Sequence, residues 1–230
     1  MLNRLFSAFF VAALLVGCGG GGDSAPAANG GAGSGGGSTF ALDTFQSNFG
    51  AVARSFTATA ANGADTYTLF LSSTPASDAL FEGAVRKRAT QTLTIRRNGV
   101  TISASTFDNF YQIGPWQAVG ATYSDGTYAV ATTPNPALPN AATVGSTGSL
   151  GVLTLYTDST RRSVVLRQEA TWTLEADTAT TAFYCVSTIA RNPSGALVAT
   201  TTGCTKYDNS GNPIGIRFTI AVDGLTLTFR

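Results

Sequence analysis

The stretch Ile214-Gly-Ile-Arg-Phe-Thr-Ile-Ala-Val222, Asp223-Gly224, Leu225-Thr-Leu-Thr-Phe-Arg230 decides the fold class. Two runs of alternating apolar and polar residues flank an Asp-Gly pair. Asp-Gly favours the two-residue type I′ turn of a β-hairpin, because both central residues of that turn need a positive φ. The resulting register pairs only apolar side chains on one face, and a slip of one residue would destroy the match. These opposed pairs are Val222 with Leu225, Ile220 with Leu227, and Phe218 with Phe229.

A second hairpin is predicted around Asn98-Gly99, which separates the alternating segments 93–97 and 100–104. A symmetric register would bring Leu93, Ile95, Ile102 and Ala104 to one buried face. No amphipathic helix of convincing length is present, although residues 76–86 have the composition for one or two helical turns. Further strands bounded by turn residues are predicted at 51–60, 65–73, 116–123, 127–132, 150–157, 162–174, 181–190 and 197–206.

These segments predict an all-β domain over residues 40–230. About 10–12 strands strain an open sheet, so we expect an antiparallel meander that closes into a barrel or doubles into a two-sheet sandwich. The six strands from Leu150 onward should follow one another as neighbours. The Pro-rich residues 133–149 interrupt the pattern, either as a long loop of a single domain, which we favour, or as a linker between two halves.

Composition excludes several kinds of function. The formal net charge is +1 and only 12% of residues are charged, so no strong field favours nucleic acid as a partner. Histidine is absent, which removes Ser-His-Asp and Cys-His catalysis and His-based metal sites. We therefore expect neither a metal nor a cofactor, and we expect the protein not to be an enzyme.

The N-terminus has the layout of a targeting segment. Arg4 precedes the apolar run 5–16, which is shorter than the ~20 residues that a membrane-spanning helix needs, and therefore indicates a cleaved signal peptide over 1–17. Leu15-Val16-Gly17-Cys18 resembles the lipobox of bacterial lipoproteins; the alternative is an ordinary secretory signal with a chance cysteine. The resemblance implies a diacylglyceryl thioether and an N-acyl chain such as palmitate on Cys18. Gly19 stands where the inner-membrane retention residue would be Asp, which by resemblance favours the outer membrane, on its periplasmic face or exposed at the cell surface.

Residues 18–39 are expected to form a flexible tether after the lipidated cysteine. They consist almost entirely of Gly, Ser, Ala and Asn, and such a segment cannot bury enough apolar surface to offset its ordering entropy. A Gly/Ser-rich coil of this length spans about 25 Å. The domain would thus contact the membrane only through its N-terminal lipid.

Two cysteines remain for a disulfide. Cys185 and Cys204 flank the turn signal at 193–196 symmetrically, so a regular hairpin brings them directly opposite each other. Cβ atoms in such a pair are ~4.5–5.5 Å apart, close to the separation that a disulfide requires. We predict a Cys185–Cys204 disulfide, in the oxidising environment that an exported protein meets.

Aromatic and basic clusters are the candidate surface features. Tyr111, Trp116 and Trp172 would line a ligand site if the barrel held a cavity, although such residues are more often simply part of a core. The basic clusters at 86–88, 96–97 and 161–162 are either contact points for anionic headgroups or an acidic partner, or solvated loop ends that discourage edge-to-edge strand pairing.

The sequence favours a lipid-anchored, non-enzymatic binding or structural accessory module of the cell envelope. Its partner would be another envelope protein or a small apolar or sugar ligand. The alternative is a carboxylate-dependent hydrolase acting on envelope glycans, which needs two carboxyl groups facing each other at ~5–9.5 Å. The residues available for this are Asp65, Asp78, Glu82, Asp108, Asp125, Glu169, Glu175 and Asp177.

Overall fold

The computed structural model describes residues 38–132, 136–222 and 224–230. The signal segment, Cys18 and the tether up to residue 37 lie outside the described residues. The elements in chain order are β1 (Thr39–Phe40), α2 (Leu42–Ala51), β2 (Arg54–Asn62), β3 (Asp65–Phe81), β4 (Ala84–Arg97), β5 (Val100–Gln112), β6 (Gln117–Tyr123), β7 (Tyr128–Ala131), β8 (Ala142–Thr143), β9 (Thr147–Tyr156), β10 (Val164–Ala176), β11 (Thr181–Arg191), β12 (Leu197–Asp208), β13 (Pro213–Val222) and β14 (Leu225–Phe229).

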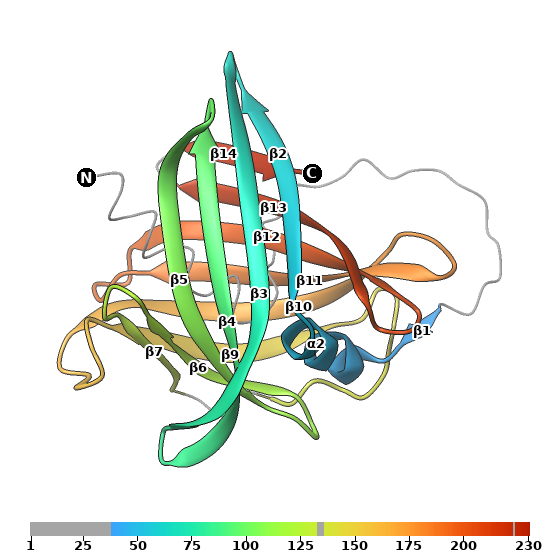
Figure 1. Ribbon diagram of the computed structural model, residues 1–230, viewed down its shortest axis with the longest axis horizontal. Coiled ribbons are helices and arrows are strands. Elements are labelled where there is room, and N and C mark those ends of the chain that lie inside the picture. The colour runs from blue at the N-terminus through green and yellow to red at the C-terminus, as the bar shows by residue number, and fades with distance from the viewer. Residues whose placement is uncertain (1–37, 133–135, 223) are drawn as a thin grey trace.

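Twelve antiparallel strands form one sheet that is nearly closed into a barrel (Figure 1). Neighbours in the sheet follow the chain from β2 to β14, apart from β8, which pairs with β1 in a small second sheet. The two ends of the large sheet meet where the backbone N–H groups of Thr59 and Arg230 donate to each other's carbonyl oxygens, both at 3.0 Å. The prediction of an all-β meander that closes is confirmed. Strands on both sides of 133–149 belong to the same sheet, because β7 pairs with β9.

The C-terminal hairpin has the predicted register. Gly224 has a φ of +77°, and the three apolar pairs lie opposite one another as expected. Phe229 is fully buried and Leu227 is 1% exposed, whereas Thr226 and Thr228 on the reverse face are exposed. Alternation along these two strands therefore separates the core from the solvent.

The hairpin at Asn98-Gly99 forms, but one expected core position is wrong. Asn98 and Gly99 have φ values of +49° and +82°, as a type I′ turn requires. Beyond the turn, Ile102 is an extra residue on β5, because Arg96 pairs with Thr101 while Ile95 pairs with Ser103. This β-bulge shifts the register by one residue, so that Ser103 is buried and Ala104 is exposed.

Helix α2 is an element that the sequence did not predict. Its N-cap residue, Ala41, makes no side-chain capping bond, so the usual sequence signal for a helix start is missing. Leu42, Phe45 and Phe49 follow helical spacing, and Phe45 stacks on Tyr207 with ring centroids 4.4 Å apart. The helix therefore forms because the end of the barrel from which β2 starts buries one of its faces (Figure 1). Among the described residues, no helix has the length and apolar character to cross a membrane.

Residues 76–86 form a hairpin, so the expected helical turn is wrong. Strand β3 continues to Phe81, and β4 begins at Ala84 after Glu82 and Gly83, which have φ values of +52° and +75°. We call residues 77–87 the arm; it projects beyond the barrel at the lower left of Figure 1. Phe81 fixes the arm by stacking on Phe110 at 4.2 Å. It lies over Gly120, where an added Cβ would come within 2.6 Å of its ring.

The predicted Cys185–Cys204 disulfide is confirmed. The two residues are direct partners on β11 and β12, although the turn over 192–196 is closed by Arg191 and Leu197. That turn alone would shift the register by one residue, and the bulge at Val198 restores it. The disulfide lies on the outer face of the barrel, since the neighbouring side chains on β11 point into the core.

Removing the ring of Phe229 should destabilise the barrel strongly. Phe229→Ala is expected to lower the free energy of unfolding by about 3–5 kcal/mol, because it leaves a cavity in the core. Thr228→Ala is the control: Thr228 is exposed, and its hydroxyl group lies 3.1 Å from that of Thr219. It should cost no more than about 1 kcal/mol. Equal losses in urea unfolding would contradict this account of β14.

The disulfide should prevent alkylation of Cys185 and Cys204 and should stabilise the fold. Peptide mass mapping after alkylation of the unreduced protein is expected to find residues 185 and 204 unmodified. The double variant Cys185→Ala, Cys204→Ala should lose about 3 kcal/mol in urea unfolding, the chain-entropy value for a loop of this length. Alkylation at either position in native protein would refute the bond.

Candidate binding site at the end of the barrel

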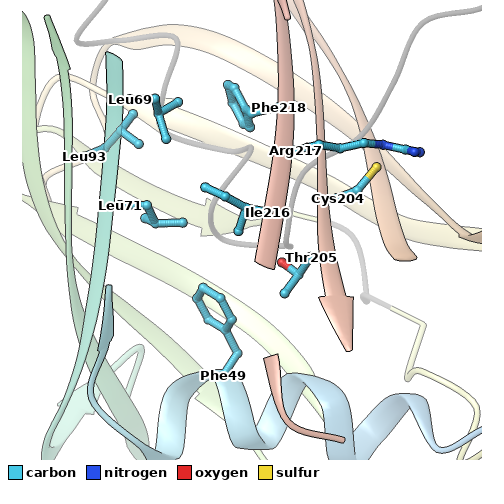
Figure 2. A pocket seen from close by; sticks show the side chains of 10 residues that line it. Phe49, Leu69, Leu71, Leu93, Cys204, Thr205, Ile216, Arg217 and Phe218 are labelled. Carbon is cyan, nitrogen blue, oxygen red and sulfur yellow. The ribbon is translucent and has the colours of Figure 1, made fainter. Parts of the chain in front are cut away.

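The lumen of the barrel holds a small cavity next to helix α2. Leu69, Leu71 and Leu93 face Ile216 and Phe218 across it (Figure 2), with Phe49 closing it from the helix. Its volume is about 20 Å³, enough for roughly one water molecule. Sites for drug-sized ligands measure roughly 300–1,000 Å³, so this part of the lumen is core rather than a ligand site.

A larger hollow lies at the end of the barrel that helix α2 covers, between the helix and strands β3 to β5, and we call it the cleft. It has a volume of about 250 Å³ and lies between the last turn of α2, the base of the arm and the end of β5. Helix α2 thus has two roles, because Phe49 faces the lumen while the next residue, Gly50, lines the cleft. The lining residues are Ser47, Gly50, Ala51, Pro75, Ala76, Asp78, Lys87, Arg88, Tyr111 and Ile113.

A bulge in β3 directs charged groups toward the cleft. Ser77 and Asp78 are left unpaired between the ladder pairs on either side. Side chains of β4 bind one group of each residue: Arg88 Nε donates to the Ser77 carbonyl oxygen at 3.1 Å, and Lys87 Nζ donates to the carboxylate oxygen Asp78 Oδ2 at 2.9 Å. Arg88 also contacts Asp108 Oδ2 through Nη1 at 3.2 Å. Each cation in the cleft lining therefore has a carboxylate partner.

Tyr111 adds a neutral hydroxyl group to this site. It lies opposite Lys87 on β5 and is 8% exposed. Its ring fits against the helix only because residue 50 is Gly: an added Cβ there would lie 2.4 Å from Tyr111 Oη. Burial, together with the negative charge of Asp78, raises the pKa of Tyr111 above its usual value. The phenol therefore stays protonated at neutral pH, where it can both donate and accept a hydrogen bond.

The three aromatic candidates from the sequence have different positions. Tyr111 lines the cleft. Trp116 is buried behind it, with ring centroids 6.3 Å apart. Trp172 belongs to the core and stacks on Tyr184 at 6.1 Å. The sequence also singled out Asp78 and the basic cluster 86–88, although not as parts of one site. Sequence reasoning missed the remaining lining residues, since most of them come from the α2 and arm segments, which were not predicted in their observed form.

The carboxylates considered for hydrolysis are dispersed over the barrel. Among the described residues, six ion pairs engage Asp65, Asp78, Glu82, Asp108, Glu175 and Asp177. The cleft lining contains one of them, Asp78. The pKa of Asp65 is lowered by hydrogen bonds from Arg97 and Asn98, and that of Asp177 by hydrogen bonds from Lys206 and Thr181. A general acid at neutral pH requires a shift in the opposite direction.

The basic clusters are largely neutralised. Lys87 and Arg88 pair with Asp78 and Asp108, and Arg97 pairs with Asp65. Arg161 pairs with Glu82 at the tip of the arm, and Glu82 also accepts a hydrogen bond from the Tyr128 hydroxyl group. The contacts of Glu82 with Arg161 and Tyr128 fix the tip of the arm to the barrel.

A cluster of charged and aromatic side chains surrounds the disulfide. Side-chain atoms of Glu175, Cys185 and Cys204 lie within 4.8 Å of one another, but the two sulfurs are bonded to each other and do not offer thiolate ligands. Arg217 pairs with Glu175 and lies over the Phe183 ring, with Cζ 4.5 Å from its centroid. This cluster covers the disulfide on the outer face of the barrel.

No protein-family model, curated protein or solved structure matches the chain. Function is therefore inferred from this chain's own residues and their arrangement.

Stability should decrease in acid, and Asp177 should contribute to the decrease. The folded-state pKa of Asp177 lies below the ordinary value of 3.8. The stability that Asp177 contributes is therefore fully present above pH 3.8 and is lost as the pH falls through the lowered pKa. Urea midpoints of the parent protein should fall between about pH 5 and pH 2, and the Asp177→Asn variant should show a shallower decrease. The matched control Glu169→Gln removes an exposed carboxylate and should follow the parent curve. A parallel curve for Asp177→Asn would contradict the role of this pair.

Proposed function

We propose that the chain is a lipid-anchored, non-enzymatic binding module of the bacterial outer membrane that meets its ligand in the cleft at the end of the barrel covered by helix α2. One observation carries the proposal: the cleft measures about 250 Å³, whereas the cavity in the lumen measures about 20 Å³. The cleft also combines mainly apolar walls with a few polar groups, which is the usual make-up of a ligand site.

The chain order supports a site that stays near its anchor. The tether that follows Cys18 reaches the folded part at β1, directly before α2, and the end of α2 lines the cleft. A helix of ten residues is about 15 Å long. With about 25 Å of flexible tether, the cleft would remain within a few tens of ångströms of the membrane and be free to turn.

A non-enzymatic role is supported by the groups in the cleft. The sequence contains no histidine, and the one carboxylate of the lining is paired with a lysine. A pair of carboxyl groups facing each other, as glycoside hydrolysis requires, is not found among the lining residues.

A second candidate function, docking to another envelope protein, is favoured by the arm. Leu80 and Val85 are direct cross-strand partners and are 73% and 71% exposed. Phe81 is buried beneath them, so the arm presents this aliphatic pair on a fixed support. Exposed apolar side chains that lie together are typical of interaction sites.

The test begins with Cys18→Ser in a Gram-negative host. The parent chain should fractionate with membranes and carry the mass of its acyl groups, whereas the variant should be soluble with an unchanged melting temperature. Retention of the variant in the membrane fraction would contradict lipid anchoring.

The soluble variant then serves to locate the site. Titration of the isotopically labelled protein with phenol, isopropanol and dioxane should shift amide resonances at 47–51, 76–78, 87–88 and 111–113. Leu69, Leu71 and Ile216 of the lumen should not respond. The cleft-filling variant Ala51→Trp should abolish the shifts, and Ala61→Trp, at an exposed position of β2, should not. Shifts confined to the lumen would overturn the proposal, and shifts confined to 79–86 would favour docking through the arm.

A further inference from the structure

The polar groups of the cleft can both donate and accept hydrogen bonds. Asp78 offers carboxylate oxygens, Lys87 offers ammonium protons, and the Tyr111 hydroxyl group can do both. Lys87 lies next to both of the others, as the ion-pair partner of Asp78 and the cross-strand partner of Tyr111. Ser47 contributes another hydroxyl group from the helix wall. A ligand that satisfies such a set must itself have donors and acceptors close together.

The charge balance disfavours an ionic ligand. An anion would be repelled by Asp78 and would have to displace it from Lys87, 2.9 Å away. Arg88 is held by Ser77 and Asp108. A cation would in turn be repelled by Lys87. Because each lining cation already has a carboxylate partner, a neutral ligand leaves no charge buried without compensation.

The remaining walls are apolar and built from small residues. Gly50, Ala51, Pro75 and Ala76 present short side chains, and Ile113, which is 53% exposed, forms part of the rim. Such walls suit a flat C–H face. The volume of about 250 Å³ lies below the range of roughly 300–1,000 Å³ for drug-sized ligands, which limits the occupant to one or two small rings.

We infer that the cleft binds a neutral sugar ring, with its hydroxyl groups on Asp78, Lys87 and Tyr111 and its C–H face against the Gly-Ala and Pro-Ala walls. A sugar hydroxyl group both donates and accepts, whereas an apolar ring of the same size would leave the charged pair without new partners. The inference rests on the proposed function, because it names the ligand class of the same cleft.

Trp116 provides the readout. The chain has two tryptophans, so the full chain carrying Cys18→Ser and Trp172→Phe reports from Trp116 alone, next to Tyr111. Methyl glucoside, N-acetylglucosamine and galactose are the neutral probes; glucuronate, glucosamine and cyclohexanol are the anionic, cationic and apolar relatives. At least one neutral sugar should give a saturable change in fluorescence, with at least about tenfold weaker binding of the three relatives.

Variants connect binding to the cleft. Lys87→Met and Asp78→Asn should each weaken binding by about tenfold or more, because each removes a charged hydrogen-bonding partner. Lys206→Met is the matched control, since Lys206 forms a similar pair with Asp177 at 2.8 Å outside the cleft. It should bind as the parent does. Gly50→Ala should also weaken binding, because its Cβ displaces Tyr111.

The outcomes separate this inference from the proposal on which it rests. If the organic probes shift cleft resonances but no neutral sugar binds, the sugar inference is overturned and the cleft remains a site. Tighter binding of glucuronate or cyclohexanol overturns it as well. If neither organic probes nor sugars bind the cleft, both proposals fail. Loss of sugar binding in Lys206→Met would show that the sugar does not bind in the cleft.

Discussion

The backbone pair between Thr59 and Arg230 is the contact on which the rest of the structure depends. It joins β14 to β2 and so nearly closes the sheet of twelve strands, which would otherwise expose two long free edges. Closure also gives the sheet an inside and an outside. Side chains of one parity then fill the lumen, and Phe229 and Leu227 of the last strand complete this core. The larger cavity therefore lies beyond this filled part, at the end of the barrel beside helix α2.

Two elements shape this end of the barrel, helix α2 and the arm. Both are fixed by aromatic contacts: Phe45 stacks on Tyr207, and Phe81 lies over Gly120. The cleft is the space left between them. Its form depends on Gly50, which lets Tyr111 lie against the helix, and on the bulge that turns Asp78 toward Lys87. Small residues and a ladder irregularity therefore shape the site.

Electrostatics give this surface a neutral character. Ion pairs at the cleft, at the arm tip and over the disulfide each match one cation with one carboxylate. Individually such exposed pairs contribute at most about 1 kcal/mol to stability. Their effect on recognition is larger, because a site whose cations are already paired favours ligands that exchange hydrogen bonds over ligands that bring a charge.

The sequence by itself determined the features that follow from local rules. Asp-Gly and Asn-Gly fixed two hairpins, alternation fixed the all-β meander, and symmetric spacing about a turn predicted the bond between Cys185 and Cys204. Tertiary structure alone decided helix α2, the exposure of Ala104 and the cleft. The helix lacks a capping signal and forms by burial against the barrel end, and the bulge at Ile102 reverses the expected alternation. The cleft joins residues from 47 to 113 that come together only after the strands have paired, so no spacing in the chain could reveal it.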